Sequence, residues 1–232
     1  MFSKDSVYSF LNNEFNDVFN HSIEIDIDSC SFLTFDYTDH LFYLFCHSYK
    51  HFVHGGFGIR QLCDMIQYMK KYSSYIDYDE YNKKIYKYNF QDLWYNLLDI
   101  AEKYLGFSYE EVDYSKPNIS LDSNDLLIDL LDSGIFGRST LERTHSSTMT
   151  LNALKDNHSS MLSNILHSLF PDYKYMKSQY KYLNNNPYLL PFSYIQRIIS
   201  YLIKKKKSKE KNNSISLGKH RIELLKKYKL IK

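Results

Sequence analysis

The apolar positions of the chain follow a helical period along most of its length. The clearest case is the stretch from Thr38 to Tyr72, where two apolar runs at helical spacing flank a glycine-rich turn. We predict one helix that starts after Thr38 as its N-cap and ends at Gly55, which would adopt the left-handed conformation. A second helix is predicted from about Gly58 to Tyr72. The predicted buried faces of the two helices consist of Leu41, Leu44, Phe45, Tyr49, Phe52, Ile59, Leu62, Cys63, Ile66 and Met69.

Similar periodicity predicts helices on both sides of this hairpin. The isoleucines Ile23, Ile25 and Ile27 instead alternate with acidic residues, which predicts one short strand, and no partner strand is evident downstream. The Ser/Thr/Asn-rich segment 138–157 is expected to be an exposed connection. The chain is therefore predicted to be mainly α, a multi-helix bundle of about nine helices with one short N-terminal strand. The other predicted helices cover residues 1–20, 78–89, 90–105, 124–133, 159–170, 172–183, 187–203 and 217–229.

Composition adds a charge asymmetry to this picture. The 36 residues from Arg197 to Lys232 carry 13 Lys/Arg against 2 Asp/Glu, whereas the rest of the chain carries 16 against 25. The body is thus acidic and the tail strongly basic. The three cysteines show no CxxC spacing, and neither a signal peptide nor a membrane-spanning apolar run is seen. We therefore expect a cytoplasmic protein with reduced thiols.

The polar side of the predicted hairpin carries the best candidate functional residues. At 100° per residue, His40, His47, His51 and His54 share a stripe about 60° wide, with Lys50 beside it. The second helix offers Arg60 and Asp64, which are four residues apart and can pair. We predict that His47, Lys50, His51, Arg60 and Asp64 contact a substrate, and we expect no catalytic residue and no metal ligand in this chain.

Other interpretations of the same residues remain open at this point. The histidines can be hydrogen-bonded structural side chains at a helix–helix seam, or His47 and His51 can bind zinc as an i, i+4 pair, although no HExxH motif and no neighbouring cysteine pair supports zinc. The third interpretation is contact with a phosphate or sugar, for which Lys50 and Arg60 are suited. Arg60 and Asp64 can also form a plain intrahelical ion pair that fixes the turn.

The basic tail invites two further interpretations. Clustered Lys/Arg with nearby tyrosines can bind nucleic acid, and an apolar helix with terminal lysines, Ile195 to Lys207, can lie on an anionic membrane surface. No recognised nucleic-acid motif is present, so a nucleic-acid partner is not expected. For Ile195 to Lys207 we favour packing into the core over a membrane surface.

The run HLFYLFCHSYKHFVHGGFGIRQLCD resembles the signature of a family of largely uncharacterised bacterial nucleotidyltransferases, often associated with surface-polysaccharide genes. The similarity continues through IDYDEYNKKIYKYNFQDLWYNLLDIAEKYLGF and LLDSGIFG, and resumes in PYLLPFSYIQRIISYL and HRIELLKKYKLI. It covers nearly the whole chain from about Ile23. The resemblance implies transfer of a nucleotidyl group from a nucleoside triphosphate, with Mg²⁺ bound by carboxylates of a catalytic core.

The sequence departs from that family pattern in one respect. No Gly-Ser pair followed by Asp-x-Asp is present, and no glycine precedes Asp26-Ile27-Asp28, so that pair lacks a phosphate-cradling turn. We therefore expect residues 1–36 to be a remnant of, or a link to, a missing catalytic core in cis or in trans. Residues 37–207 would form the helical domain, and 208–232 a linker and a basic C-terminal helix.

Two functions follow as hypotheses. In the first, the chain is the helical C-terminal part of a metal-dependent nucleotidyltransferase, supports the core and its acceptor pocket, and is inactive alone. In the second, it is a free-standing helical binding or scaffold protein that uses its basic C-terminal tail. Whether the chain is itself an enzyme is left open by the sequence.

Overall fold

The structure is a computed structural model. It describes residues 8–135, 147, 149–151, 154, 170–184, 186–207 and 211–231, with backbone alone for 201–207 and 211–215. The predicted helix 159–170, apart from Phe170, and most of the predicted connection 138–157 lie outside the described residues.

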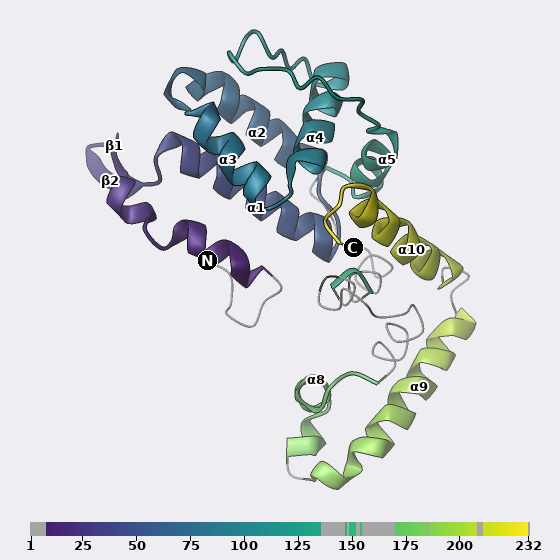
Figure 1. Cartoon of the computed structure of the whole chain (residues 1–232). Helices are drawn as coiled ribbons and strands as arrows, with labels where there is room; N and C mark the ends of the chain where they lie inside the picture. The colour runs from purple at the N-terminus through teal and green to yellow at the C-terminus, as the bar shows by residue number, and fades with distance from the viewer. Residues whose placement is uncertain are drawn as a thin grey trace.

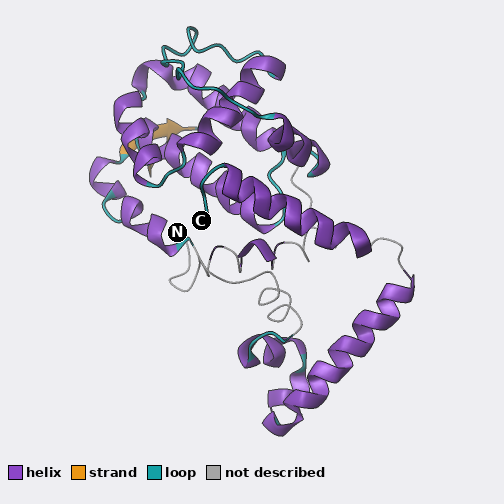
Figure 2. Ribbon diagram, turned by 45° about the vertical axis from the view of Figure 1, so that its right-hand side comes forward, coloured by secondary structure: helices purple, strands orange, loops and turns teal. Residues whose placement is uncertain are grey.

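The described part of the chain is mainly helical, which confirms the predicted fold class (Figures 1 and 2). The 3₁₀ helices are η1 (Ser9–Phe15), η2 (Val18–His21), η3 (Ser73–Tyr75), η4 (Lys181–Asn184) and η5 (Pro187–Leu189). The α-helices are α1 (Tyr37–His54), α2 (Ile59–Tyr72), α3 (Tyr78–Lys87), α4 (Gln91–Tyr104), α5 (Asn124–Asp132), α8 (Tyr173–Gln179), α9 (Leu190–Lys207) and α10 (Lys211–Lys227).

The predicted strand has a partner, contrary to the expectation from sequence. Strand β1 (Ile23–Ile27) pairs antiparallel with β2 (Cys30–Thr34), so that Ile23 lies opposite Thr34 and Ile27 opposite Cys30. Asp28 and Ser29 connect them, both with positive φ (50° and 67°), as a tight two-residue hairpin turn requires. The partner was missed because the side chains of β2 are mostly exposed and show no alternation of apolar and polar residues.

Helices α1 and α2 form the predicted hairpin, with two corrections at its ends. The N-cap of α1 is Asp36, whose carboxylate accepts a hydrogen bond from Asp39 N at 2.8 Å. The Thr38 hydroxyl instead accepts from Asp77 N at 2.9 Å and so joins the starts of α1 and α3. At the other end α1 stops at Gly55 as predicted, but the positive φ (136°) belongs to Gly56.

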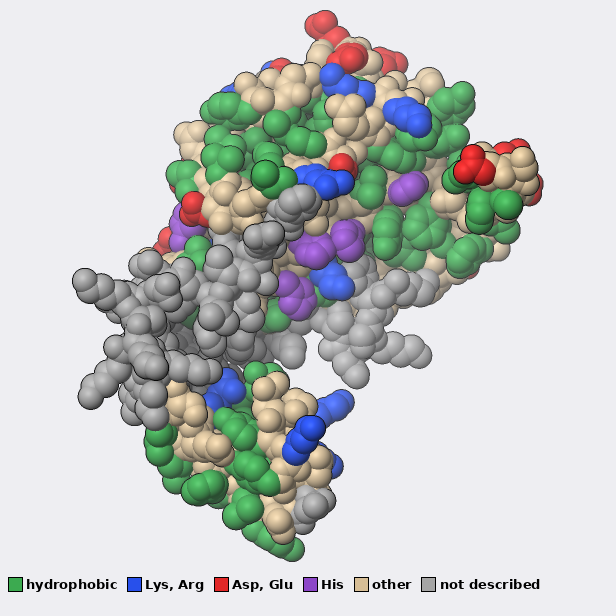
Figure 3. Space-filling model, turned by 180° about the vertical axis from the view of Figure 1, so that it is seen from behind, with side chains coloured by type: hydrophobic (Ala, Val, Ile, Leu, Met, Phe, Trp, Pro, Cys, Tyr) green, Lys and Arg blue, Asp and Glu red, His purple; other side chains and the backbone are tan. Residues whose placement is uncertain are grey.

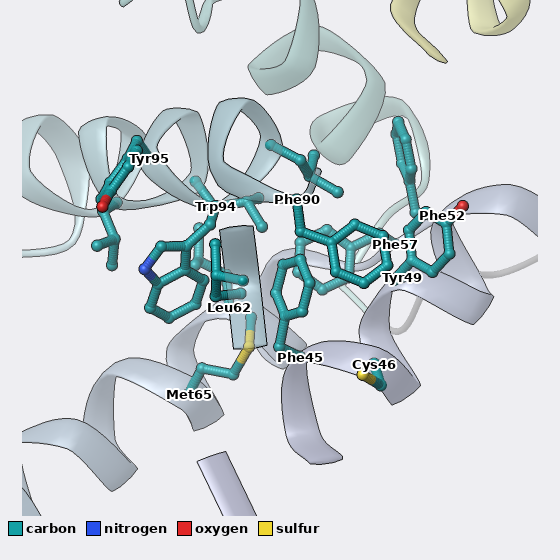
Figure 4. Close-up of a cluster of buried hydrophobic side chains, with 14 of the residues drawn as sticks. Phe45, Cys46, Tyr49, Phe52, Phe57, Leu62, Met65, Phe90, Trp94 and Tyr95 are labelled. Atoms are coloured by element: carbon teal, nitrogen blue, oxygen red, sulfur yellow. The ribbon is translucent and has the colours of Figure 1, made fainter. Parts of the chain in front are cut away.

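The core lies where α1, α2, α3 and α4 meet, and it is built largely from aromatic rings (Figure 4). The Phe45 ring of α1 packs edge-on against Trp94 of α4, with ring centroids 5.5 Å apart. Tyr49 packs against Phe90, which precedes α4, at 4.8 Å. The Trp94 indole N–H donates to the hydroxyl of Tyr114 at 3.1 Å, so its one polar atom is satisfied. These contacts determine which face of α1 is buried in the core.

The C-terminal helices occupy two different places. Helix α10 packs beside α5, and Leu224, Leu225, Tyr228 and Ile231 join the core cluster. Helices α8 and α9 lie apart from α1–α5 in both views (Figures 1 and 2). Helix α10 includes Lys211, so the last helix begins earlier than the predicted Leu217.

Candidate functional site

Helix α1 has a core face and a polar face. Leu41, Phe45, Tyr49 and Phe52 are buried. Turned away from them, His47, Lys50 and His54 are exposed, while His40 and His51 are half-buried. In the space-filling view histidine side chains gather on one side of the molecule, close to a Lys or Arg side chain (Figure 3). The core fixes the rotation of α1, and that rotation sets which side chains this polar face presents.

His47 and His51 are in direct contact in the middle of this face. Their Nε2 atoms lie 3.1 Å apart, and their ring centroids lie 4.6 Å apart with nearly perpendicular planes. A hydrogen bond between two imidazoles needs one N–H donor and one lone pair, so at least one ring is neutral. His47 also stacks on Tyr43 at a centroid distance of 6.2 Å. The structure therefore brings these two predicted residues together as a pair.

The pKa values of the histidines on α1 are all lowered from the ordinary value. Partial burial is the main cause for His47 and His51, and the ammonium of Lys50 adds to it. His51 is lowered further by its neighbours His47 and His54. The pair is consequently neutral at pH 7, with both ring donors and ring acceptors on the surface, and Lys50 supplies the positive charge beside it.

The two outer histidines have aromatic neighbours. His40 packs between Phe35 and Tyr68, with centroid distances of 6.2 and 4.9 Å. His54 packs against Tyr8 at 5.6 Å. The four-histidine stripe is thus not uniform, because its ends contact one ring just before η1, one just after β2 and one on α2. The polar centre of the face is His47, Lys50 and His51, which we call the histidine face.

Arg60 and Asp64 form the ion pair that their spacing predicted. Arg60 Nε lies 3.9 Å from Asp64 Oδ2, with side chains 60% and 62% exposed. The backbone N–H of Arg60 donates to the Ile135 carbonyl at 3.3 Å and ties the start of α2 to the turn after α5. Four of the five candidate residues are thus joined as two pairs, His47 with His51 and Arg60 with Asp64.

The C-terminal end of α1 depends on residues that sequence analysis did not single out. The Phe52 carbonyl accepts from the guanidinium of Arg221, and the Val53 carbonyl accepts from the Thr150 hydroxyl at 2.7 Å. Arg221 is buried in α10 and lies 3.7 Å from the buried carboxylate of Asp129. The sequence does contain one indication that Arg221 is buried, because Arg221 shares a helical stripe with the apolar Leu224, Leu225 and Tyr228.

A hollow beside the end of α4 does not suit a nucleotide. It measures about 450 Å³ and lies along the loop after α4. Glu102, Glu110 and Asp113 line it, and its lysine, Lys116, is paired with Glu102 at 2.7 Å. Such an acidic wall repels phosphate, so we place the candidate site on α1 and not here.

The N-terminal half of the chain is similar to a known protein family. Residues 2–106 match a family described as uncharacterised nucleotidyltransferases. The match includes β1, β2 and helices α1–α4, and therefore the whole histidine face and the Arg60–Asp64 pair. No curated protein and no solved structure matches the chain.

The matched segment is shorter than the similarity inferred from sequence. It ends at Gly106, so LLDSGIFG and the two later stretches lie beyond it, and it starts at Phe2, well before Ile23. The family similarity is thus carried by the N-terminal half of the chain. Among the described residues, no helix has the length and apolar character needed to cross a bilayer.

Magnesium, which we expected from the resemblance seen in the sequence, needs a group of oxygen ligands. The described residues contain no cluster of three or more His, Cys, Asp or Glu side chains that would hold a metal ion. Asp26 and Asp28 are both exposed, and Asp28 lies in the turn of the strand hairpin. These residues do not fit a two-carboxylate magnesium site, and no reaction step is assigned to them.

Proposed function

We propose that this chain is the helical part of a metal-dependent nucleotidyltransferase whose histidine face contacts a phosphate or sugar of the reactants. The family match supports the reaction class. The observation that carries the proposal is the His47–His51 contact at 3.1 Å on an exposed face next to Lys50. The rest of α1 is fixed in an aromatic core, so these groups are held in place before any ligand binds.

The chemistry of the face suits a phosphoryl group. A neutral imidazole N–H donates to a phosphate oxygen, and the Lys50 ammonium adds a mobile positive charge. An anion bound here would raise the lowered pKa values of His47 and His51, because it favours their charged form. Protonation would then break the His–His hydrogen bond and turn both rings into donors. Binding is therefore expected to take up protons and to strengthen as the pH falls toward 6.

We propose that Arg60 and Asp64 extend this surface at the start of α2. A guanidinium forms two parallel hydrogen bonds to a phosphate, and a carboxylate accepts from sugar hydroxyls. Their mutual ion pair is exposed and is worth little to folding, so a ligand can replace it at low cost.

The nucleotidyl-transfer centre itself would be supplied by other residues, in cis or in trans. The supporting observation is that this sequence has no Gly-Ser pair followed by Asp-x-Asp. On this proposal the chain does not turn over a nucleoside triphosphate with Mg²⁺ by itself. Turnover that the substitution Asp26→Ala abolishes would show instead that the strand hairpin is catalytic.

Calorimetric titration of the full chain with a nucleoside triphosphate tests the binding face. Lys50→Gln and His51→Gln should each weaken binding by about tenfold, which corresponds to the loss of one charged hydrogen bond. The matched control is Lys83→Gln, an exposed lysine on α3, which should leave binding unchanged. Equal weakening by the control would reduce the effect to general charge and contradict the proposal.

A further inference from the structure

The α8–α9 arm, residues 170–207, displays a row of large apolar side chains to solvent. On α9, Phe192, Ile195 and Ile199 follow one another at spacings of three and four residues, and they are 58%, 54% and 49% exposed. Tyr188, just before the helix, is 89% exposed. This differs from the expectation that Ile195 to Lys207 packs into the core. Phe192, Ile195 and Ile199 share one side of α9 and form what we call the apolar stripe.

The apolar stripe is not the core face of a misplaced helix, because the arm has a small core of its own. Met176, Leu183 and Ser193 are fully buried within it. The Tyr194 hydroxyl donates to the Pro171 carbonyl at 2.8 Å, and the Tyr182 hydroxyl donates to Gln196 Oε1 at 2.9 Å. The Tyr194 hydrogen bond and the buried Ser193 fix the rotation of α9, and the stripe lies on the opposite side of the helix. The Tyr182–Gln196 contact lies at the edge of the stripe.

The arm is also strongly basic. Residues 171–207 contain 8 Lys/Arg and a single acidic residue, Asp172. Helix α9 ends in four consecutive lysines, Lys204–Lys207. An exposed apolar stripe that runs into a lysine cluster combines the two features that hold a helix at an anionic bilayer surface, namely buried apolar area and attraction to lipid headgroups.

We propose that the α8–α9 arm binds the surface of a membrane rich in anionic lipid, with α9 lying in the plane of the interface. Ile195, Ile199 and Phe192 would enter the acyl boundary, and Tyr188 would lie at headgroup level, where amphipathic rings are favoured. The lysines would contact phosphate and carboxylate headgroups. The absence of a spanning helix among the described residues agrees with binding along the surface.

The side chains favour lipid over nucleic acid as the partner. Single-stranded nucleic acid is bound by aromatic rings that stack on bases, whereas two of the three α9 side chains in the stripe, Ile195 and Ile199, are aliphatic. Arg197 lies over the Tyr175 ring at 5.4 Å and so makes a contact within the arm. An anionic bilayer offers both contacts that these residues need, acyl chains for the isoleucines and charged headgroups for the lysines.

Flotation of the full chain with vesicles tests the proposal. The probes are vesicles of phosphatidylcholine alone and of phosphatidylcholine with phosphatidylserine. We expect binding to the mixed vesicles only, with a steep decrease as salt is raised. The double substitution Ile195→Ser/Ile199→Ser should weaken it by about tenfold or more. Each Lys→Gln change in Lys204–Lys207 should weaken it by roughly fivefold.

The matched control is Ile128→Ser/Leu131→Ser, two comparably exposed apolar residues of α5. This variant should bind mixed vesicles like the original chain, and circular dichroism should show unchanged helix content in both double variants. Equal loss in the control, or no binding to mixed vesicles at low salt, overturns the proposal. Preferential binding of a single-stranded oligonucleotide that displaces the vesicles would also overturn it and assign the arm to nucleic acid.

Discussion

The guanidinium of Arg221 donates a hydrogen bond to the backbone carbonyl of Phe52, 169 residues earlier in the chain. Phe52 is in the last turn of α1, where carbonyl groups have no partner within the helix. Arg221 is 1% exposed, and its charge is balanced by the buried Asp129 of α5. A positive charge at the C-terminus of a helix is also favoured by the helix dipole. Arg221 thus joins α10 and α5 to the end of the helix that carries the histidine face.

We predict that Arg221→Leu lowers the free energy of unfolding by about 3 kcal/mol or more, because it leaves the Asp129 carboxylate buried without its charge partner. The measurement is urea unfolding at neutral pH. Replacing Asp129 as well, with Arg221→Leu/Asp129→Leu, should recover part of the loss. The cycle is completed by the single variant Asp129→Leu. If the losses of the two single variants simply add in the double variant, Arg221 and Asp129 are not coupled, which would contradict this account.

The exposed Arg60–Asp64 pair of α2 should contribute much less to stability than the buried Arg221–Asp129 pair. Arg60→Leu should change the free energy of unfolding by less than about 0.5 kcal/mol, since exposed i, i+4 pairs contribute little. The same urea titration measures it. A loss as large as that of Arg221→Leu would mean that Arg60 has a structural role that its exposure does not indicate.

The histidine pair should make stability depend on pH. The pKa values of His47 and His51 are lowered in the folded state, so below about pH 6.5 the unfolded chain binds more protons than the folded chain. The free energy of unfolding should therefore fall as the pH drops from about 7.5 to about 5. The variant His47→Gln/His51→Gln should show a smaller fall in the free energy of unfolding. The control is His21→Gln, which replaces an exposed histidine of η2 and should show the same fall as the unsubstituted chain. Identical pH profiles for all three proteins would contradict the lowered pKa values.

The start of α1 gives a prediction about two side chains that are easily confused in sequence. Asp36→Ala should cost about 1 kcal/mol of stability by removing the cap on Asp39 N. Thr38→Val should cost a similar amount for another reason, because it leaves the backbone N–H of Asp77 without its acceptor. Thermal unfolding measures both. If Asp36→Ala were neutral and Thr38→Val alone costly, Thr38 would be the cap that the sequence suggested.

A structural zinc ion at the histidine pair would need further ligands. Zinc in structural sites takes four, and the described residues offer no group of three. We therefore predict that a chelator leaves the melting temperature of the chain unchanged. A decrease on chelation that added Zn²⁺ reverses, and that His47→Gln/His51→Gln removes, would favour the zinc interpretation over phosphate contact.

The helices were predictable because each carries its own local signals. Asp77 caps α3 as expected, with its carboxylate accepting from Glu80 N at 2.9 Å, and Gly106 has the positive φ that ends α4. The N-terminal segment was less predictable: its apolar spacing suggested an α-helix, whereas the described residues form η1 and η2. Leu11, Phe15 and Val18 are buried all the same, so tertiary packing satisfied the pattern without a regular α-helix.

The candidate site was predictable in part. Helical spacing placed His47 next to His51 and Arg60 next to Asp64, and both pairs exist. Spacing along one helix cannot report what comes from distant segments, and so it missed the rings of Phe35, Tyr68 and Tyr8 around the outer histidines. It missed Arg221 for the same reason. On α9, helical spacing identified the apolar residues. It did not show that Ile195 and Ile199 face solvent, because the contacts that orient α9 come from other parts of the arm.

The central claim is that His47, Lys50 and His51 bind a phosphoryl group. The most direct measurement is a titration of the full chain with nucleoside triphosphate, observed through the NMR signals of the histidine ring Cε1–H groups. We predict saturable shifts of the His47 and His51 signals in the direction of protonation, lost in Lys50→Gln, with His21 unaffected. Signals of His47 and His51 that stay in place, or that move no more than that of His21, would contradict the account.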